Sequence, residues 1–103
     1  MIKPIADRAE VALDFPEKLY IGSFGRGSGY ETTVDAEQVM IRLARAGGGE
    51  KRAVEMHLHY YLLADLLEDI ARGLAAQPAL DEAHRSRVAE AVEALRAAIG
   101  PAS

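Results

Sequence analysis

Hydrophobic and polar residues change their spacing near residue 60. At positions 54 to 60, apolar or aromatic side chains at even positions alternate with Glu55, His57 and His59, the two-residue repeat of a strand with one buried face. Beyond residue 60 the apolar side chains recur every three or four residues, the stripe of a helix that packs along one side. They are Leu62, Leu63, Leu66, Leu67, Ile70 and Leu74. The pattern predicts a strand over 51–59 that continues directly into a helix over about 61–76.

One alternative stays open for this stretch. Residues 51–75 could form a single long helix, because Val54, Leu58 and Leu62 are also spaced for one. The strict alternation favours the strand, and so do three consecutive glycines at 47–49, which are typical of a hairpin loop.

Alternating or β-prone residues upstream predict further strands over 10–15, 18–24, 30–34 and 38–45, separated by short turns. Strands joined by short turns pair antiparallel. For residues 9–14 a short helix competes, capped by Asp7 with Glu10 three residues later. The strand is favoured because Pro16 would end such a helix at once. Residues 1–8 are expected to be a loose lead-in.

A last helix is predicted over 81–99. Asp81 suits its N-cap, and Gly100-Pro101 is a stop signal. The expected fold is a single α+β domain over residues 1–103. It consists of an antiparallel meander of four to five strands (about 9–59), followed by two antiparallel helices (about 61–76 and 81–99) packed on one sheet face.

Composition narrows the class of protein. The absence of cysteine excludes disulfides and thiolate metal sites, and no signal peptide or membrane-spanning stretch is recognisable, so a cytoplasmic location is expected. Residues 1–52 are electrically balanced, so the formal charge of −4 arises in the second half, which makes nucleic acid an unfavourable partner. The abundance of arginine over lysine and of alanine suggests a bacterial origin.

Glu55, His57 and His59 are the candidate ligands for a divalent transition metal. Side chains two residues apart on one face of a strand lie about 6–7 Å apart, and two imidazoles with a carboxylate are a common ligand set. His84 could complete a fourth position. The structural interpretation is that these are polar residues on the open side of a sheet.

Gly25, Arg26 and Gly27 are the candidate anion- or nucleotide-binding residues, within a glycine-rich stretch at 22–29. Backbone N–H groups of such a loop can point at a phosphate beside an arginine. The structural interpretation is a hairpin loop whose glycines supply positive φ.

Asp65, Glu68 and Asp69 form an acidic helix face that could dock a basic protein partner, or simply face solvent. No catalytic constellation is recognisable, so we expect a non-enzymatic protein-interaction or regulatory module. The amount of apolar surface on a small chain predicts that it self-associates as a homodimer.

Overall fold

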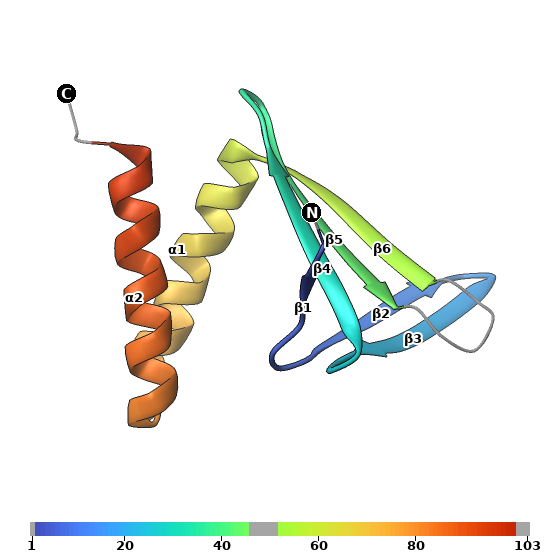
Figure 1. The fold of residues 1–103 in the computed structure, drawn as a ribbon, viewed down its shortest axis with the longest axis horizontal. Coiled ribbons are helices and arrows are strands. Elements are labelled where there is room, and N and C mark those ends of the chain that lie inside the picture. The colour runs from blue at the N-terminus through green and yellow to red at the C-terminus, as the bar shows by residue number, and fades with distance from the viewer. Residues whose placement is uncertain (1, 46–51, 101–103) are drawn as a thin grey trace. The chain divides into compact units, whose positions relative to one another are not determined.

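The computed structural model describes residues 2–45 and 52–100, and these residues form six strands followed by two helices (Figure 1). The chain divides into two compact units, Met1–Asp65 and Leu66–Ser103. The first unit holds all the strands, and the second holds most of the first helix and all of the second. The strands are β1 (Lys3–Pro4), β2 (Ala9–Phe15), β3 (Lys18–Phe24), β4 (Ser28–Val34), β5 (Gln38–Arg45) and β6 (Arg52–His59); the helices are α1 (Tyr60–Ala76) and α2 (Glu82–Ile99).

These elements confirm the predicted α+β class and the strand over residues 9–14. The predicted hairpin loop at 46–50 lies outside the described residues. The predicted packing of the helices on one sheet face stays a prediction, because the sheet and most of the helical residues belong to different units.

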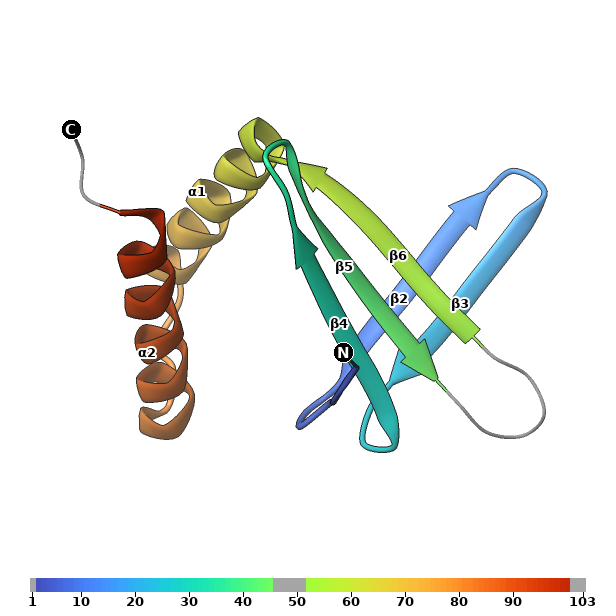
Figure 2. The same cartoon turned by 45° about the horizontal axis from the view of Figure 1, so that its top comes forward.

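The strands form two antiparallel sheets where the sequence suggested one meander. β1, β4, β5 and β6 make a four-stranded sheet in that order, and β2 and β3 make a separate hairpin. The hairpin crosses the larger sheet, with β3 against β5 (Figure 2). The expected loose lead-in contains β1, which pairs with β4 through Lys3 and Pro4. Alternation along a strand reveals its buried face but does not identify its neighbour, so the division into two sheets was not predictable from the pattern.

The glycine-rich stretch is mostly strand. Gly22 belongs to β3 and Gly29 to β4, so the loop expected over residues 22–29 is reduced to residues 25–27. Only Gly27 among them has a positive φ, of 95°, the conformation that favours glycine. Because β3 and β4 pair with different partners, this connection passes from one sheet to the other and is not a hairpin turn.

The change from strand to helix falls between His59 and Tyr60, close to the predicted position. Residues 52–59 pair with β5 along their whole length, which excludes the alternative of one long helix. The Tyr60 hydroxyl donates a hydrogen bond of 2.7 Å to the backbone carbonyl of Asp35 in the β4–β5 turn. Tyr61, the next residue, is 94% exposed. The two adjacent tyrosines therefore differ: Tyr60 anchors the start of α1 to the sheet, and Tyr61 faces solvent.

The second unit is a helical hairpin in which α1 and α2 run antiparallel (Figure 1). Asp81 caps α2 as predicted, its carboxylate accepting from the backbone N–H of His84 at 3.3 Å. Gly100 ends α2 with a φ of 95°. Among the described residues of either helix no side chain is fully buried. Each helix thus keeps part of its apolar stripe accessible.

Burial in the single chain is concentrated at one position. Phe24, at the end of β3, is 1% exposed and is the only fully buried hydrophobic side chain in the described part of the chain. It lies opposite Ala9 in the β2–β3 register, on the same hairpin face as Val11 and Tyr20. Aromatic side chains bury more apolar area than most others, so Phe24 is the main anchor of the first unit.

Candidate functional site

The register of β5 and β6 separates the larger sheet into an apolar and a polar face. Val39, Ile41 and Leu43 lie opposite Leu58, Met56 and Val54, and these six side chains share one face. The residues between them share the other face. They are Gln38, Met40, Arg42 and Ala44 on β5, opposite His59, His57, Glu55 and Ala53 on β6. The polar face therefore carries most of the hydrogen-bonding and ionisable side chains of these two strands.

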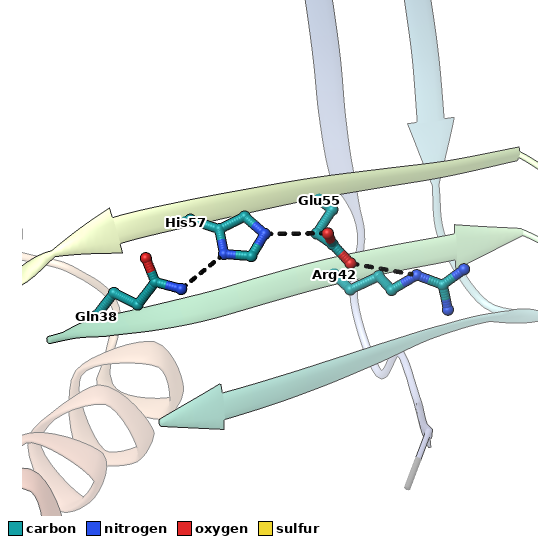
Figure 3. A network of polar contacts seen from close by, with 4 residues as sticks. All are labelled: Gln38, Arg42, Glu55 and His57. Carbon is teal, nitrogen blue, oxygen red and sulfur yellow. Dashed lines mark hydrogen bonds and ion pairs between the residues drawn. The ribbon is translucent and has the colours of Figure 1, made fainter. Parts of the chain in front are cut away.

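A chain of polar contacts runs along this face from Gln38 to Arg42 (Figure 3). Gln38 Nε2 lies 2.9 Å from His57 Nδ1, and His57 Nε2 lies 3.0 Å from Glu55 Oε2. Glu55 Oε1 then lies 4.0 Å from Arg42 Nε. With the Gln38 amide donating, Nδ1 accepts, and Nε2 is the ring nitrogen that donates to Glu55. Both ring nitrogens of His57 are therefore engaged, and the ring is fixed in one orientation.

The three predicted metal ligands do share the polar face. Glu55 and His57 contact each other directly, and His59 lies opposite Gln38 at the end of β6. Across residues 2–45 and 52–100, no three histidine, cysteine or acidic side chains gather closely enough to hold a metal ion. A metal at this position would have to displace Gln38 or Glu55 from a nitrogen of His57. The metal site stays a prediction that needs such a rearrangement.

The predicted anion-binding residues form the connection between the two sheets. The backbone N–H of Ser28 donates to the carbonyl of Gly25 at 2.9 Å, and Arg26 forms a β-bridge with Ser28. The Ser28 amide is therefore used inside the turn. A hollow in the sheet surface lies beside this connection, and Gly27 is one of its lining residues.

That hollow has a volume of about 380 Å³ and lies where β1, β4, β5 and β6 meet. Ala44 and Ala53 lie side by side in the register of β5 and β6, and Gly29 lies beside Ala44 on β4. This row of the smallest side chains forms the floor. The other described residues that line the hollow are Ile2, Lys3, Pro4, Gly27, Ser28, Arg42, Arg45 and Arg52. Sequence reasoning missed this site because the row of small residues is assembled from three strands.

Gly29 is required by the close approach of β1. A Cβ atom at this position would overlap the side chain of Ile2 and would lie 3.2 Å from the Lys3 carbonyl oxygen. The absence of a side chain at Gly29 therefore lets Ile2 lie against β4, where it forms one wall of the hollow. The glycine-rich stretch therefore includes one glycine that is needed for packing, but the sequence alone does not distinguish it from a glycine that serves loop flexibility.

The predicted acidic face of α1 contains an internal counter-ion. Arg72 Nη1 lies 3.9 Å from Glu68, and Arg72 Nη2 lies 3.5 Å from Asp69. All three side chains are largely exposed, and such pairs are only weakly stabilising. Asp65 lies one turn earlier on the same helix. Arg72 thus partly offsets the negative charge that a basic partner would recognise.

Two exposed carboxylates have lowered pKa values. Backbone N–H groups of Glu37 and Gln38 donate to Asp35 at 2.7 and 3.0 Å and lower its pKa, with smaller contributions from His59 and His57. The side-chain hydrogen bond from His84 is the main cause of the lowered pKa of Asp81, followed by the backbone N–H of the same residue. In each case the donors favour the ionised form. Asp35 therefore stabilises the β4–β5 turn, and Asp81 stabilises the start of α2.

Comparison with protein-family models, with curated proteins and with solved structures finds no match. Neither described helix has the length and apolar content needed to cross a membrane.

Proposed function

We propose that this protein is a self-associating interaction module whose helical hairpin pairs with the hairpin of a second copy. The main support is the helical unit, in which both helices keep apolar stripes accessible. On α1 these residues are Leu66, Leu67, Ile70 and Leu74, and on α2 they are Val88, Val92, Leu95 and Ile99; each is at least 40% exposed. Isolated exposed apolar residues are ordinary, but continuous stripes mark a surface that another element covers.

The spacing of the two stripes supports a second copy as the cover. Apolar residues at 63, 67, 70 and 74, and again at 88, 92, 95 and 99, follow the alternating four- and three-residue steps of a helical-bundle seam. Two antiparallel helices with such seams cannot enclose a core by themselves, whereas two hairpins make a four-helix bundle. A two-fold symmetric pair satisfies both copies with one self-complementary surface. Alanines beside the α2 stripe allow the helices to approach closely.

The limited core of the single chain also supports association. With Phe24 as its one fully buried hydrophobic side chain among the described residues, the chain buries far less apolar surface than about 100 residues need for a stable fold. Apolar residues are also accessible at the tip of the β2–β3 hairpin, where Phe15 is 60% and Leu19 is 67% exposed. Burial between copies supplies the missing hydrophobic stabilisation.

A second protein would then be bound by the assembled dimer. The exposed carboxylates of Asp65, Glu68 and Asp69 lie on the side of α1 away from the stripe, so they stay accessible when the stripe is buried. Acidic groups on a polar rim favour a partner with a basic surface. In this proposal the apolar stripe builds the dimer and the acidic face selects the partner.

The deciding experiment is the molar mass in solution, measured by light scattering or sedimentation over a wide concentration range. We expect a dimer for the unaltered chain and a monomer or an unfolded chain for Ile70→Glu, which places a carboxylate in the seam. Ala76→Glu adds the same charge to α1 away from the seam and should remain dimeric. A chain that is monomeric and folded at all concentrations would overturn the proposal.

A further inference from the structure

The outer edge of β6 is a second surface on which copies of this chain can meet. In the order β1-β4-β5-β6, β6 is the last strand, and no described strand pairs with its outer side. We propose that the β6 strands of two copies pair antiparallel along this edge, so that their larger sheets become one sheet. This contact goes beyond the proposed helical pairing, because it uses none of the residues of the helical stripes.

The two edges of the larger sheet differ in their protection. At one edge lies β1, which has two residues and includes Pro4, and short strands and prolines are usual protections of a sheet edge. At the other edge β6 is eight residues long, contains no proline and pairs with β5 residue by residue without a bulge. Its outer backbone groups therefore form a template for a further strand.

Side-chain exposure along β5 and β6 agrees with a missing neighbour. Residues 38–44 of β5, which lies between two strands, are all half-buried. In β6 only Val54 and Leu58 are half-buried, and the remaining residues are exposed. Met56 lies between these two on the apolar face and is 44% exposed. A strand added at this edge would cover apolar surface as well as backbone.

The β2–β3 hairpin extends past the outer edge of β6. It crosses the larger sheet on the apolar side, behind the polar network, and its tip lies beyond β6 (Figures 2 and 3). On the hairpin face that carries Phe24, exposure rises toward the tip, from 1% at Phe24 to 41% at Leu13 and 60% at Phe15. One sheet therefore covers only the first part of the hairpin. A second sheet joined at β6 would present its own apolar face to Leu13 and Phe15.

The sequence of β6 is complementary to itself in one antiparallel register. A two-fold axis perpendicular to the joined sheet keeps both apolar faces on the same side, so apolar residues lie opposite apolar residues. With the axis at Met56, Val54 lies opposite Leu58 of the second copy, and Glu55 lies opposite His57 of the second copy. Both kinds of cross-strand pair are stabilising, and each occurs twice. The pairing covers residues 53–59 and ends before α1 begins.

The neighbouring registers are less favourable. An axis at Glu55 would place two carboxylates directly opposite each other, which is destabilising. An axis at His57 would shorten the pairing, because the strand ends at His59. An axis at Val54 would place Met56 opposite an arginine. The charges and the apolar residues of β6 therefore select a second copy in the register centred on Met56.

The edge contact adds to the helical dimer and does not replace it. It pairs one strand from each copy, and backbone hydrogen bonds made in exchange for hydrogen bonds to water stabilise only modestly. At low protein concentration we therefore expect the helical dimer alone. As the concentration rises, the β6 edges join such dimers to each other.

The test is disulfide crosslinking of the full-length chain, which contains no cysteine of its own. In the proposed register Met56 lies opposite Met56 of the second copy, at a Cα–Cα distance of about 4.5–5.5 Å that suits a disulfide. Met56→Cys should therefore form a covalent dimer on air oxidation. Leu58→Cys is the matched control on the same face of the same strand. Its two copies would lie about 13 Å apart along the joined strands and should not link.

A second pair of variants tests the charge complementarity. Adding His57→Glu to Met56→Cys places a carboxylate opposite each Glu55, and the linked fraction should fall by about 2- to 10-fold. Adding Thr33→Glu instead introduces the same charge on the same sheet face, but on β4, and should leave the linked fraction unchanged. Circular dichroism of each variant before oxidation checks that the fold is kept.

Three results would overturn the proposal. The first is a folded Met56→Cys chain that forms no covalent dimer. The second is equal linking of Leu58→Cys, which would show random collision or another register. The third is hydrogen exchange of the outer β6 amides that does not slow as protein concentration rises, which would leave the edge to a strand of another protein. If Met56→Cys links while the unaltered chain is monomeric at low concentration, the helical pairing fails alone. If the unaltered chain is a dimer and Met56→Cys does not link, the edge contact fails alone.

Discussion

Replacing Ile70 by alanine tests the proposed helical interface quantitatively. The substitution removes three side-chain carbons, worth about 2.4 kcal/mol when fully buried, at ~0.8 kcal/mol per carbon. In the single chain 57% of Ile70 is exposed, so about 1.4 kcal/mol of that stabilisation is available to association in each copy. A symmetric dimer contains the site twice, which gives about 2.7 kcal/mol and a dissociation constant raised roughly 100-fold. The buried remainder weakens the protomer itself.

The assay is sedimentation equilibrium over several protein concentrations, with the helix content of each sample checked by circular dichroism. Arg72→Ala is the matched control, because it also introduces alanine on α1 but lies away from the stripe. Its ion pairs with Glu68 and Asp69 are exposed and contribute little, so its dimer should dissociate at nearly the same concentration as the unaltered chain. Equal dissociation constants for Ile70→Ala and the unaltered chain, in samples of equal helix content, would refute burial of the stripe between copies.

Three further predictions follow from the described contacts. Phe24→Ala should lower the free energy of unfolding, measured by urea titration, by about 3–5 kcal/mol, because it empties the one fully buried hydrophobic position of the described chain. Phe15 is 60% exposed, so Phe15→Ala should lower that free energy clearly less. Similar losses in the two variants would show that Phe24 is not the anchor. Asp81→Ala should reduce the helix signal of α2 whereas Asp81→Asn preserves the cap. Because the pKa of Asp81 is lower in the folded than in the unfolded state, the contribution of its ionised form is present above about pH 3.9 and is lost as the pH falls through the folded pKa. The difference between Asp81→Ala and the unaltered chain should therefore shrink in acid, and a pH-independent difference would contradict the assignment. If Glu55, His57 and His59 bind a metal, Zn²⁺ should raise the melting temperature of the unaltered chain. It should not raise that of a His57→Ala/His59→Ala double variant. If Zn²⁺ does not change the melting temperature of the unaltered chain, the metal hypothesis is wrong.

The local elements were predictable because their signals lie within a few residues. The alternation before residue 60 identified β6, and the three- and four-residue spacing after it identified α1. Asp81 and Gly100 marked the ends of α2 through capping chemistry that depends on single side chains. The polar face that carries Glu55, His57 and His59 also followed from alternation, because the period of a strand fixes which side chains share a side.

The neighbours of each strand were not predictable in the same way. Residues 3–4 contain too few positions to show a period, yet they pair with β4 and provide a wall of the hollow. Gly29 resembled the loop glycines around it, although its role is to admit Ile2. The contacts of His57 with Gln38 and Glu55 required the register of β5 against β6, which a one-residue shift would destroy.

By itself the sequence determined the type and limits of most elements, because backbone propensity, capping and periodicity act between residues close in the chain. Tertiary structure alone decided that the strands divide into two sheets and that Ala44, Ala53 and Gly29 lie side by side in the larger one. The physical reason is that a pairing partner is chosen by the packing of whole faces, and residues distant in the chain become neighbours only after that choice is made.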